Sequence, residues 1–183
     1  GGAFVNINSS ATFVNCTLSG NHAASGTAIL NFNHSPTYIN CIVWDHIDSG
    51  DGRIENFSST PTYTHCLIEA SGGSASWDAT LGTDGGNNID ADPLFLVPVD
   101  PSTAPSTTGG DLRLRIGSPA IDVGDNTPNS EVSDLAGNPR IVDGNGDTTT
   151  TIDLGAFEIP TPIIVTNTNN SGTGSLRDAI DLI

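Results

Sequence analysis

The residues best suited to bind a metal ion lie in the run DGNGD at 143–147. Asp143, Asn145 and Asp147 follow the alternating order of calcium-binding loops, in which oxygen atoms converge on a hard cation. Asp153 follows shortly afterwards as a fourth candidate ligand. The glutamate that closes a helix-flanked calcium loop is missing, and turns rich in glycine, asparagine and aspartate are the alternative explanation. We predict structural calcium held by these four residues.

The elements that must position these residues begin with a repeat. Cys16, Cys41 and Cys66 are the only cysteines, and successive ones are 25 residues apart. Matched columns at one period, here apolar, aromatic and asparagine columns, are the sequence signature of a repeat architecture. The matching segments are AFVNINSSATFVNCTLSG (3–20), AILNFNHSPTYINCIVWD (28–45) and RIENFSSTPTYTHCLIEA (53–70).

Short β-favouring runs, divided by serine, asparagine, glycine and proline, predict strands in each unit. Known helical repeats are longer than these units. The predicted fold is all-β: a right-handed parallel β-helix, a solenoid whose coils are stacked about 4.8 Å apart. The prediction adds irregular C-terminal coils and a short C-terminal strand followed by a capping helix.

Stacking of coils explains the recurrent side chains. Cysteine is small and apolar, so a column of it fills an interior without crowding. Side chains on neighbouring parallel strands point the same way, which is poor geometry for a disulfide, so we predict buried free thiols. Asparagines at the bends can pass side-chain hydrogen bonds from coil to coil. We expect one ladder of Asn6, Asn31 and Asn56, and a weaker one of Asn15, Asn40 and His65.

The net charge of the chain limits the classes of partner that it is expected to bind. It has 21 acidic residues against 5 basic ones, all arginine, and its net charge is −16. Nucleic acid and anionic membrane surfaces repel such a polyanion, so neither is an expected partner. No apolar run approaches the ~20 residues that cross a bilayer. The acidity is compatible with solubility, with high-salt surroundings and with cation binding.

The repeat divides the chain into three parts. Residues 1–72 hold the regular coils. Residues 73–159 are rich in loop signals and short apolar-alternating runs, and we expect irregular coils and loops that close the solenoid, because an open end needs covering. Residues 160–183 predict a strand, a turn and a short amphipathic helix with Ser175 as its N-cap.

Most of the chain resembles bacterial exported proteins. The units, SPTYINCIVWD among them, resemble the parallel β-helix repeats of the polymorphic outer-membrane protein type. The runs NIDADPLF, DLRLRIGSPAIDVGDNT, SDLAGNPRIVDGNGD and IDLGAFE resemble the choice-of-anchor Q segment that follows such repeats. The resemblance covers roughly residues 1–159 and implies a secreted or surface-displayed bacterial protein. It implies architecture rather than activity.

The C-terminal segment resembles the opening of a further β-helix unit in those proteins, where its helix would lid the first coil. The chain opens on an uncapped coil and ends on such a cap. Two arrangements are expected: the sequence is a window from a tandem array, or the tail of one copy completes the next in an end-to-end fibre. A frayed or self-docked tail is the alternative.

An enzymatic role is the main rival to a structural one. Polysaccharide lyases and hydrolases also use the β-helix, and their chemistry needs acids with a base, or paired carboxylates. Arg53 lies near Asp51 and Glu55, with Asp45 and Asp48 one coil earlier, but no nucleophile–base constellation is evident. We expect a structural or adhesive extracellular protein that is not an enzyme. A carbohydrate-active enzyme and a non-catalytic glycan-binding module are the alternatives.

Overall fold

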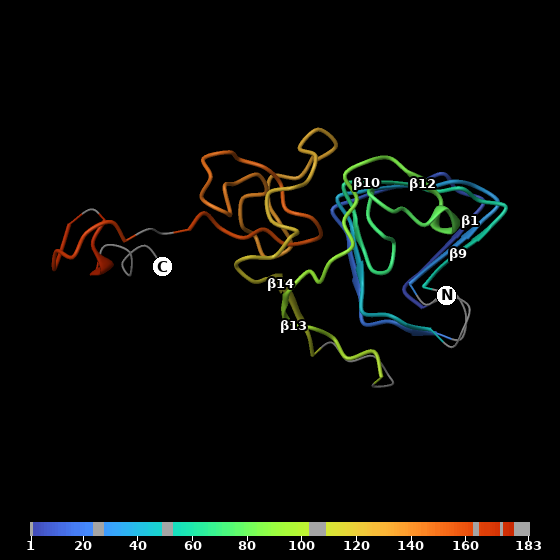
Figure 1. The fold of residues 1–183 in the computed structure, drawn as a ribbon, viewed down its shortest axis with the longest axis horizontal. Helices are drawn as coiled ribbons and strands as arrows, with labels where there is room; N and C mark the ends of the chain where they lie inside the picture. Colours follow the sequence, from blue (N-terminus) through green and yellow to red (C-terminus); the bar gives the residue numbers. More distant parts are fainter. Residues whose placement is uncertain are drawn as a thin grey trace.

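The computed structural model describes residues 2–23, 28–48, 53–102, 109–162, 165–172 and 174–177. The fold is all-β, with parallel sheets whose strands are stacked in register. The repeat units lie at one end of the molecule, residues 115–159 form a second body beside them, and the C-terminal segment extends away from both (Figure 1). No helix in these ranges has the length and apolar character to cross a membrane.

The units contribute the same short strands in the same order, with a fourth strand described only in the first two. The first unit holds β1 (Phe4–Ile7), β2 (Thr12–Val14), β3 (Thr17–Ser19) and β4 (His22–Ala23). The second holds β5 (Ile29–Phe32), β6 (Thr37–Ile39), β7 (Ile42–Trp44) and β8 (Ile47–Asp48). The third holds β9 (Ile54–Phe57), β10 (Thr62–Thr64) and β11 (Leu67–Ile68).

The strands pair in parallel with their counterparts one unit later. The sheets run β1-β5-β9, β2-β6-β10 and β3-β7-β11, and β4 pairs with β8. Each partner lies 25 residues further on, as Phe4 pairs with Ile29 and Ile29 with Ile54. The predicted parallel stacking in register is therefore confirmed.

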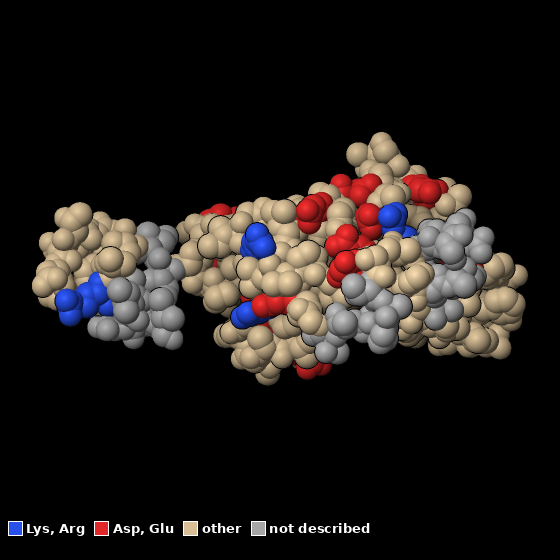
Figure 2. All heavy atoms as spheres, turned by 90° about the horizontal axis from the view of Figure 1, so that it is seen from below, with Lys and Arg blue, Asp and Glu red and all other residues tan. Residues whose placement is uncertain are grey.

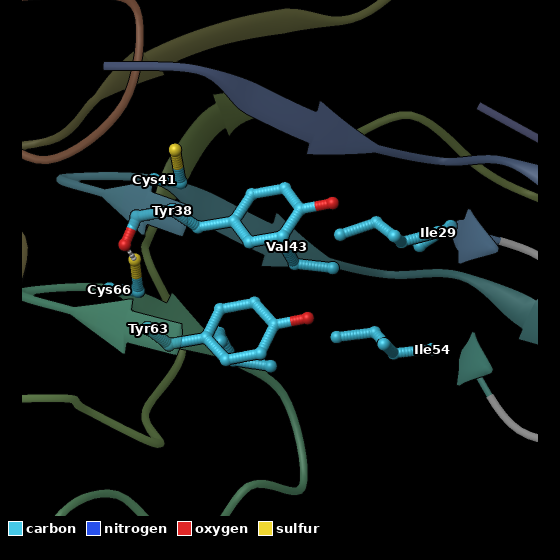
Figure 3. Packing of buried hydrophobic residues seen from close by; sticks show 9 residues of the cluster. Ile29, Tyr38, Cys41, Val43, Ile54, Tyr63 and Cys66 are labelled. Atoms are coloured by element: carbon cyan, nitrogen blue, oxygen red, sulfur yellow. Dashed lines mark hydrogen bonds between the residues drawn. The ribbon is translucent and has the colours of Figure 1, made fainter. Parts of the chain in front are cut away.

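The interior of the units is built from columns of one side-chain type. Tyr38 stacks on Tyr63 with ring centroids 4.9 Å apart, and Phe13 stacks on Tyr38 at 5.0 Å. Cys41 lies above Cys66, whose thiol donates to the carbonyl oxygen of Tyr38 at 3.4 Å (Figure 3). The cysteines are free, and Cys41 and Cys66 are fully buried, as predicted. Each stacked aromatic pair adds about 0.5–1.5 kcal/mol beyond its burial.

In each unit the chain bends at three positions with left-handed backbone, and each position recurs as a column through the stack. Asparagine and glycine tolerate this conformation best, which explains why asparagine recurs at the bends. A ladder that the sequence analysis missed lies at one of them, where Asn33 Nδ2 donates to Asn8 Oδ1 at 2.9 Å. The columns, all with φ between 49° and 69°, are Asn8, Asn33 and Ser58; Asn15, Asn40 and His65; and Gly20, Asp45 and Ala70.

The two predicted ladders form in part. In the first, Asn31 Nδ2 donates to Asn56 Oδ1 at 2.9 Å, whereas Asn6 Nδ2 donates to the carbonyl oxygen of Ser9. Tyr38 Oη also donates to Asn31 Oδ1 at 3.1 Å, which ties the ladder to the aromatic column.

In the second ladder, Asn40 Nδ2 donates to Asn15 Oδ1 at 3.0 Å. His65, one unit further, instead hydrogen-bonds through Nε2 to Asn87 Nδ2 at 2.9 Å. The amide-to-amide pairing is thus confirmed for Asn15 and Asn40. His65, the third member, hydrogen-bonds to a residue that follows the repeat.

Residues 71–90 cover the far edge of the third unit. β12 (Thr83–Asp84) pairs with β10, and a short 3-10 helix, η1 (Ala79–Leu81), lies beside β9. Asn56 Nδ2 donates to two carbonyl oxygens of η1, at 3.2 and 2.9 Å. Trp77 packs on the last of the stacked tyrosines with ring centroids 5.7 Å apart. This segment therefore covers one end of the stack.

The rest of the second half differs from the predicted irregular coils. β13 (Phe95–Val97) and β14 (Asp111–Leu114) pair antiparallel. The isolated bridges Ser133–Pro139 and Val142–Thr151 are antiparallel as well. The pairings described in this part do not continue the parallel stack, because the 25-residue pattern that directs such stacking ends with the third unit.

The second body packs against the side of the units through a shared core and through Asn40. Asn40 Oδ1 accepts from Asp125 N at 2.8 Å, and its Nδ2 donates to Asp125 O at 2.9 Å. The carbonyl oxygen of Asn40 accepts from Gly155 N at 2.7 Å. The core joins Ile42 and Leu67 of the units to Phe95, Leu114, Ala120, Ile121 and Leu154.

The predicted C-terminal strand is not formed over residues 165–172, and no capping helix is seen in the described part of the chain. The backbone amides of Thr166 and Asn167 donate to the carbonyl oxygen of Gly174, which makes a turn of this segment. Leu176 and Arg177 are helical, and the rest of the predicted helix lies outside the described residues.

Replacing Asn40 with glycine tests the attachment of the second body. Glycine keeps the left-handed bend but removes the amide, so Asp125 and Asn15 lose partners at a buried site. We expect the free energy of unfolding to fall by about 2–4 kcal/mol in urea titrations. Asn33→Gly is the matched control: it removes a ladder amide at an equivalent but exposed bend and should cost less than about 1 kcal/mol. Equal losses in both variants would contradict this account.

Candidate functional site

The DGNGD run forms a loop organised around the Asp143 carboxylate. Its Oδ1 accepts from the backbone amides of Gly146 and Asp147 at 2.7 and 3.1 Å, and its Oδ2 accepts from that of Thr148 at 2.9 Å. Asn145 Oδ1 accepts from the backbone amide of Asp147 at 2.8 Å, and Asn145 Nδ2 donates to Asp147 Oδ2 at 3.3 Å. Three of the four predicted ligands therefore lie together.

Asp153, the fourth predicted ligand, faces other groups. It is fully buried, and its Oδ1 and Oδ2 accept from the backbone amides of Asp122 and Ile159 at 2.8 and 2.7 Å. Asp122 connects it to the loop, because the Asp122 carboxylate accepts from the backbone amides of Gly144 and Asn145. The described hydrogen bonds of the Asp153 carboxylate do not reach the loop itself.

The four residues do not converge as a ready set of calcium ligands. Oxygen atoms of Asp143 and Asp147 already accept hydrogen bonds from their own loop, and calcium takes six to eight oxygen ligands. No group of three or more His, Cys, Asp or Glu in the described ranges is arranged to hold a metal ion. Calcium at this loop stays a prediction, and an ion bound there would have to displace the hydrogen bonds that shape the loop.

Three acids and one arginine form a buried cluster next to the loop: Asp134, Arg140, Asp153 and Glu158. Arg140 Nε lies 3.5 Å from Glu158 Oε1, and its Nη2 donates to the carbonyl oxygen of Gly155. Glu158 Oε1 accepts from the backbone amide of Asp153 at 3.0 Å, and Asp134 Oδ2 accepts from that of Glu158 at 2.9 Å. The cluster thereby ties three loop segments together.

Burial sets the protonation of this cluster. It raises the pKa of Glu158 to about 9, with the Asp153 charge adding to the effect and Arg140 opposing it. It raises the pKa of Asp153 to about 6, against hydrogen bonds from two backbone amides. Burial would also raise the pKa of Asp134, but hydrogen bonds from Glu158 and Asn138 outweigh burial, so the pKa of Asp134 is lowered. Burial, together with the Asp153 charge, therefore favours the protonated form of Glu158 at neutral pH.

Arg53, the base that an enzymatic role would need, is engaged in an ion pair. Its Nη2 donates to Glu69 Oε1 at 2.9 Å. A base that abstracts a proton from a sugar has to reach the substrate, and this contact holds the guanidinium against its own unit instead. Of the acids predicted near it, Asp45 and Glu55 lie in the described residues, and Asp51 and the side chain of Asp48 lie outside them.

His46 is a buried polar residue whose role the sequence analysis missed. Its Nδ1 accepts from the backbone amide of Asn21 at 3.2 Å, and its Nε2 lies 3.1 Å from the carbonyl oxygen of Leu18. The neutral ring with a proton on Nε2 satisfies both contacts. Burial lowers the pKa of His46 to about 4, which favours that neutral form. The 25-residue offset between Asn21 and His46 was the available signal.

Two cavities border the second body. One of about 400 Å³ lies between the bend at Asn15 and the 128–135 loop, with Asp134 and Arg140 in its wall. Arg140 Nη1 is buried and has no hydrogen-bond partner in the described part of the protein. The other, of about 1240 Å³, is mainly apolar and is bordered by Arg115. Neither wall includes a histidine or a cysteine.

We expect stability to fall as pH rises from 7 to 8, a window below the range in which the thiols of the unfolded chain ionise. The folded chain keeps a proton on Glu158 that the unfolded chain, with an ordinary carboxyl pKa, has already lost. The folded state therefore binds more protons in this window, and the unfolding free energy should drop by about 1 kcal/mol per pH unit. Glu158→Gln should remove this slope in urea titrations, and exposed Glu131→Gln should keep it. A wild-type slope in Glu158→Gln would contradict the assignment.

Calcium binding can be tested by its effect on thermal unfolding. If the loop binds calcium, millimolar CaCl₂ should raise the melting temperature of the wild type, because a ligand at 100 times its dissociation constant adds about 2.7 kcal/mol. Asp143→Asn should abolish this increment. Asp92→Asn, which alters an aspartate in an ordinary turn, should keep it. The prediction fails if calcium leaves the wild type unchanged or stabilises both variants alike.

Comparison of the chain with models of protein families, with curated proteins and with solved structures gives no match.

Proposed function

We propose that this chain is a structural segment of a right-handed parallel β-helix, a solenoid whose coils are the three 25-residue units. The observation that carries the proposal is the register: strands that recur in successive units pair with their counterparts at an offset of 25 residues. Right-handed crossovers between parallel strands are the rule, which favours that hand.

The contacts that the polar side chains make support a structural role for the chain rather than a catalytic one. Carboxylates such as Asp143 and Asp153 accept hydrogen bonds from the backbone and shape loops. His46 bridges two units in its neutral form, and Arg53 is held by Glu69. Hydrogen bonding to a neighbouring thiol and burial raise the pKa of Cys16, which disfavours the reactive thiolate. Groups that could do chemistry are thus engaged in holding the fold.

The proposed setting is the outside of a bacterial cell, where the protein would serve a structural or adhesive role. The resemblance of its units to surface β-helix repeats supports this setting, as does its high acidity. End-to-end assembly through residues 160–183 fits the position of residues 165–172 and 174–177, which lie away from the body of the molecule (Figure 1). Repeated heterologous contacts that do not close build fibres.

Electron micrographs and polysaccharide assays test the proposal together. We expect elongated particles in negative stain and no release of reducing ends or unsaturated products from acidic or neutral polysaccharides. Product release that is lost in Arg53→Ala, but kept in the ion-paired control Arg113→Ala, would replace the structural role with an enzymatic one. A crystal structure without stacked coils would overturn the β-helix itself.

A further inference from the structure

The first unit presents an unpaired strand edge. Phe4 N donates to the carbonyl oxygen of Ala28, and Asn8 N donates to that of Phe32, both toward the second unit. Alternate residues of a parallel strand direct their backbone groups to opposite sides. The backbone N–H and C=O of Val5 therefore face away from the second unit, on a side where β1 has no partner strand within the described residues.

Within the described residues this edge lacks the protection that open edges usually carry. Natural proteins blunt such edges with charged residues, with proline or with a covering segment. Residues 1–44 contain no Asp, Glu, Lys or Arg, so all 21 acidic residues and all 5 arginines lie from Asp45 onward. On the face drawn in Figure 2 the acidic atoms gather over the middle of the molecule. The uncharged first unit is therefore suited to receive another strand.

The C-terminal segment carries the sequence pattern of the strand that would fit there. In each copy the first residue is apolar, the third is asparagine, the fifth is asparagine or serine, and the seventh is serine or threonine. The copies are FVNINSS (4–10), ILNFNHS (29–35), IENFSST (54–60) and VTNTNNS (165–171). The fourth copy thus repeats β1, β5 and β9 together with the bend that follows each of them.

This fourth copy is not paired in a sheet; the backbone amides of Thr166 and Asn167 donate to the carbonyl oxygen of Gly174, and pairing with β1 would replace this turn. Residues 165–172 form no strand, and the Val165 side chain is 45% exposed. No charged residue lies between Glu158 and Arg177, so the segment is as uncharged as the edge. The segment and the repeat units lie at opposite ends of the molecule, with residues 115–159 between them (Figure 1). A second copy of the chain is therefore the partner that can bring the two together.

We propose that residues 165–171 of one copy add a parallel strand to β1 of a second copy. This inference rests on the proposed β-helix. Val165 pairs with Phe4, Asn167 extends the column of Asn6, and Asn169 extends that of Asn8. The contact joins two uncharged segments, so the net charge of −16 on each copy does not oppose it locally.

The contact gives each copy one donor segment and one acceptor edge. The other end of the stack is covered by residues 71–90 and offers no second acceptor there. Each copy consequently receives one tail and gives one, and this arrangement extends in a line unless the rotation between copies closes a ring.

Two aspartate variants, one residue apart, test the register. In the proposed strand the side chain of residue 167 points inward, in the column of buried Asn6, and that of residue 168 points outward, in the column of Ile7, which is 59% exposed. Sedimentation at several concentrations should show wild type and Thr168→Asp assembling alike. Asn167→Asp should weaken assembly at least about tenfold, because it buries a charge at the contact. Both variants lie outside the stacked units and should keep the wild-type circular dichroism.

Two outcomes would overturn the inference. A wild-type chain that stays monomeric at every concentration excludes the contact, and with it the end-to-end assembly. Assembly of the wild type with equal behaviour of the two variants shows that copies join elsewhere, and leaves the β-helix and its structural role intact. Neither outcome resembles failure of the β-helix, which would appear as a crystal structure without stacked units.

Discussion

Stacking of like side chains in the interior and at the bends, once every 25 residues, is the constraint on which the structure depends. Each unit is a few short strands and cannot enclose a core alone, so its interior exists only between neighbours. A residue in such a column has to pack on, or hydrogen-bond to, its counterparts in the preceding and the following unit. Asparagine meets this demand at the bends, because it accepts the left-handed backbone and also links units through its amide.

The parts of the structure that follow this constraint could be predicted, and the others could not. The parallel register, the free thiols and the Asn15–Asn40 contact all follow from the period. The antiparallel pairing of β13 with β14 carries no period and left no signal in the sequence. Asp153 is predicted as a metal ligand because it follows the DGNGD run closely, and spacing along the chain does not reveal that its carboxylate accepts from the backbone amide of Ile159.

The second body shows what replaces regular pairing when the period ends. Its loops are held largely by carboxylates that accept backbone amides, as at Asp122, Asp134 and Asp143. Part of the acidity of the chain is therefore internal and structural. The loops also bring several acids together around Arg140, and burial with the Asp153 charge raises the pKa of Glu158 to about 9.

Near-identical units carry a hazard during folding, because a strand could pair with the wrong copy and still find matching neighbours. The covering segment at residues 71–90 removes that ambiguity. Its indole ring, Trp77, needs a tyrosine face that is not already occupied, and η1 needs an asparagine amide that is not already used by a following unit. Only the last unit offers both, so the covering segment fixes which unit comes last and thereby the order of the units along the stack.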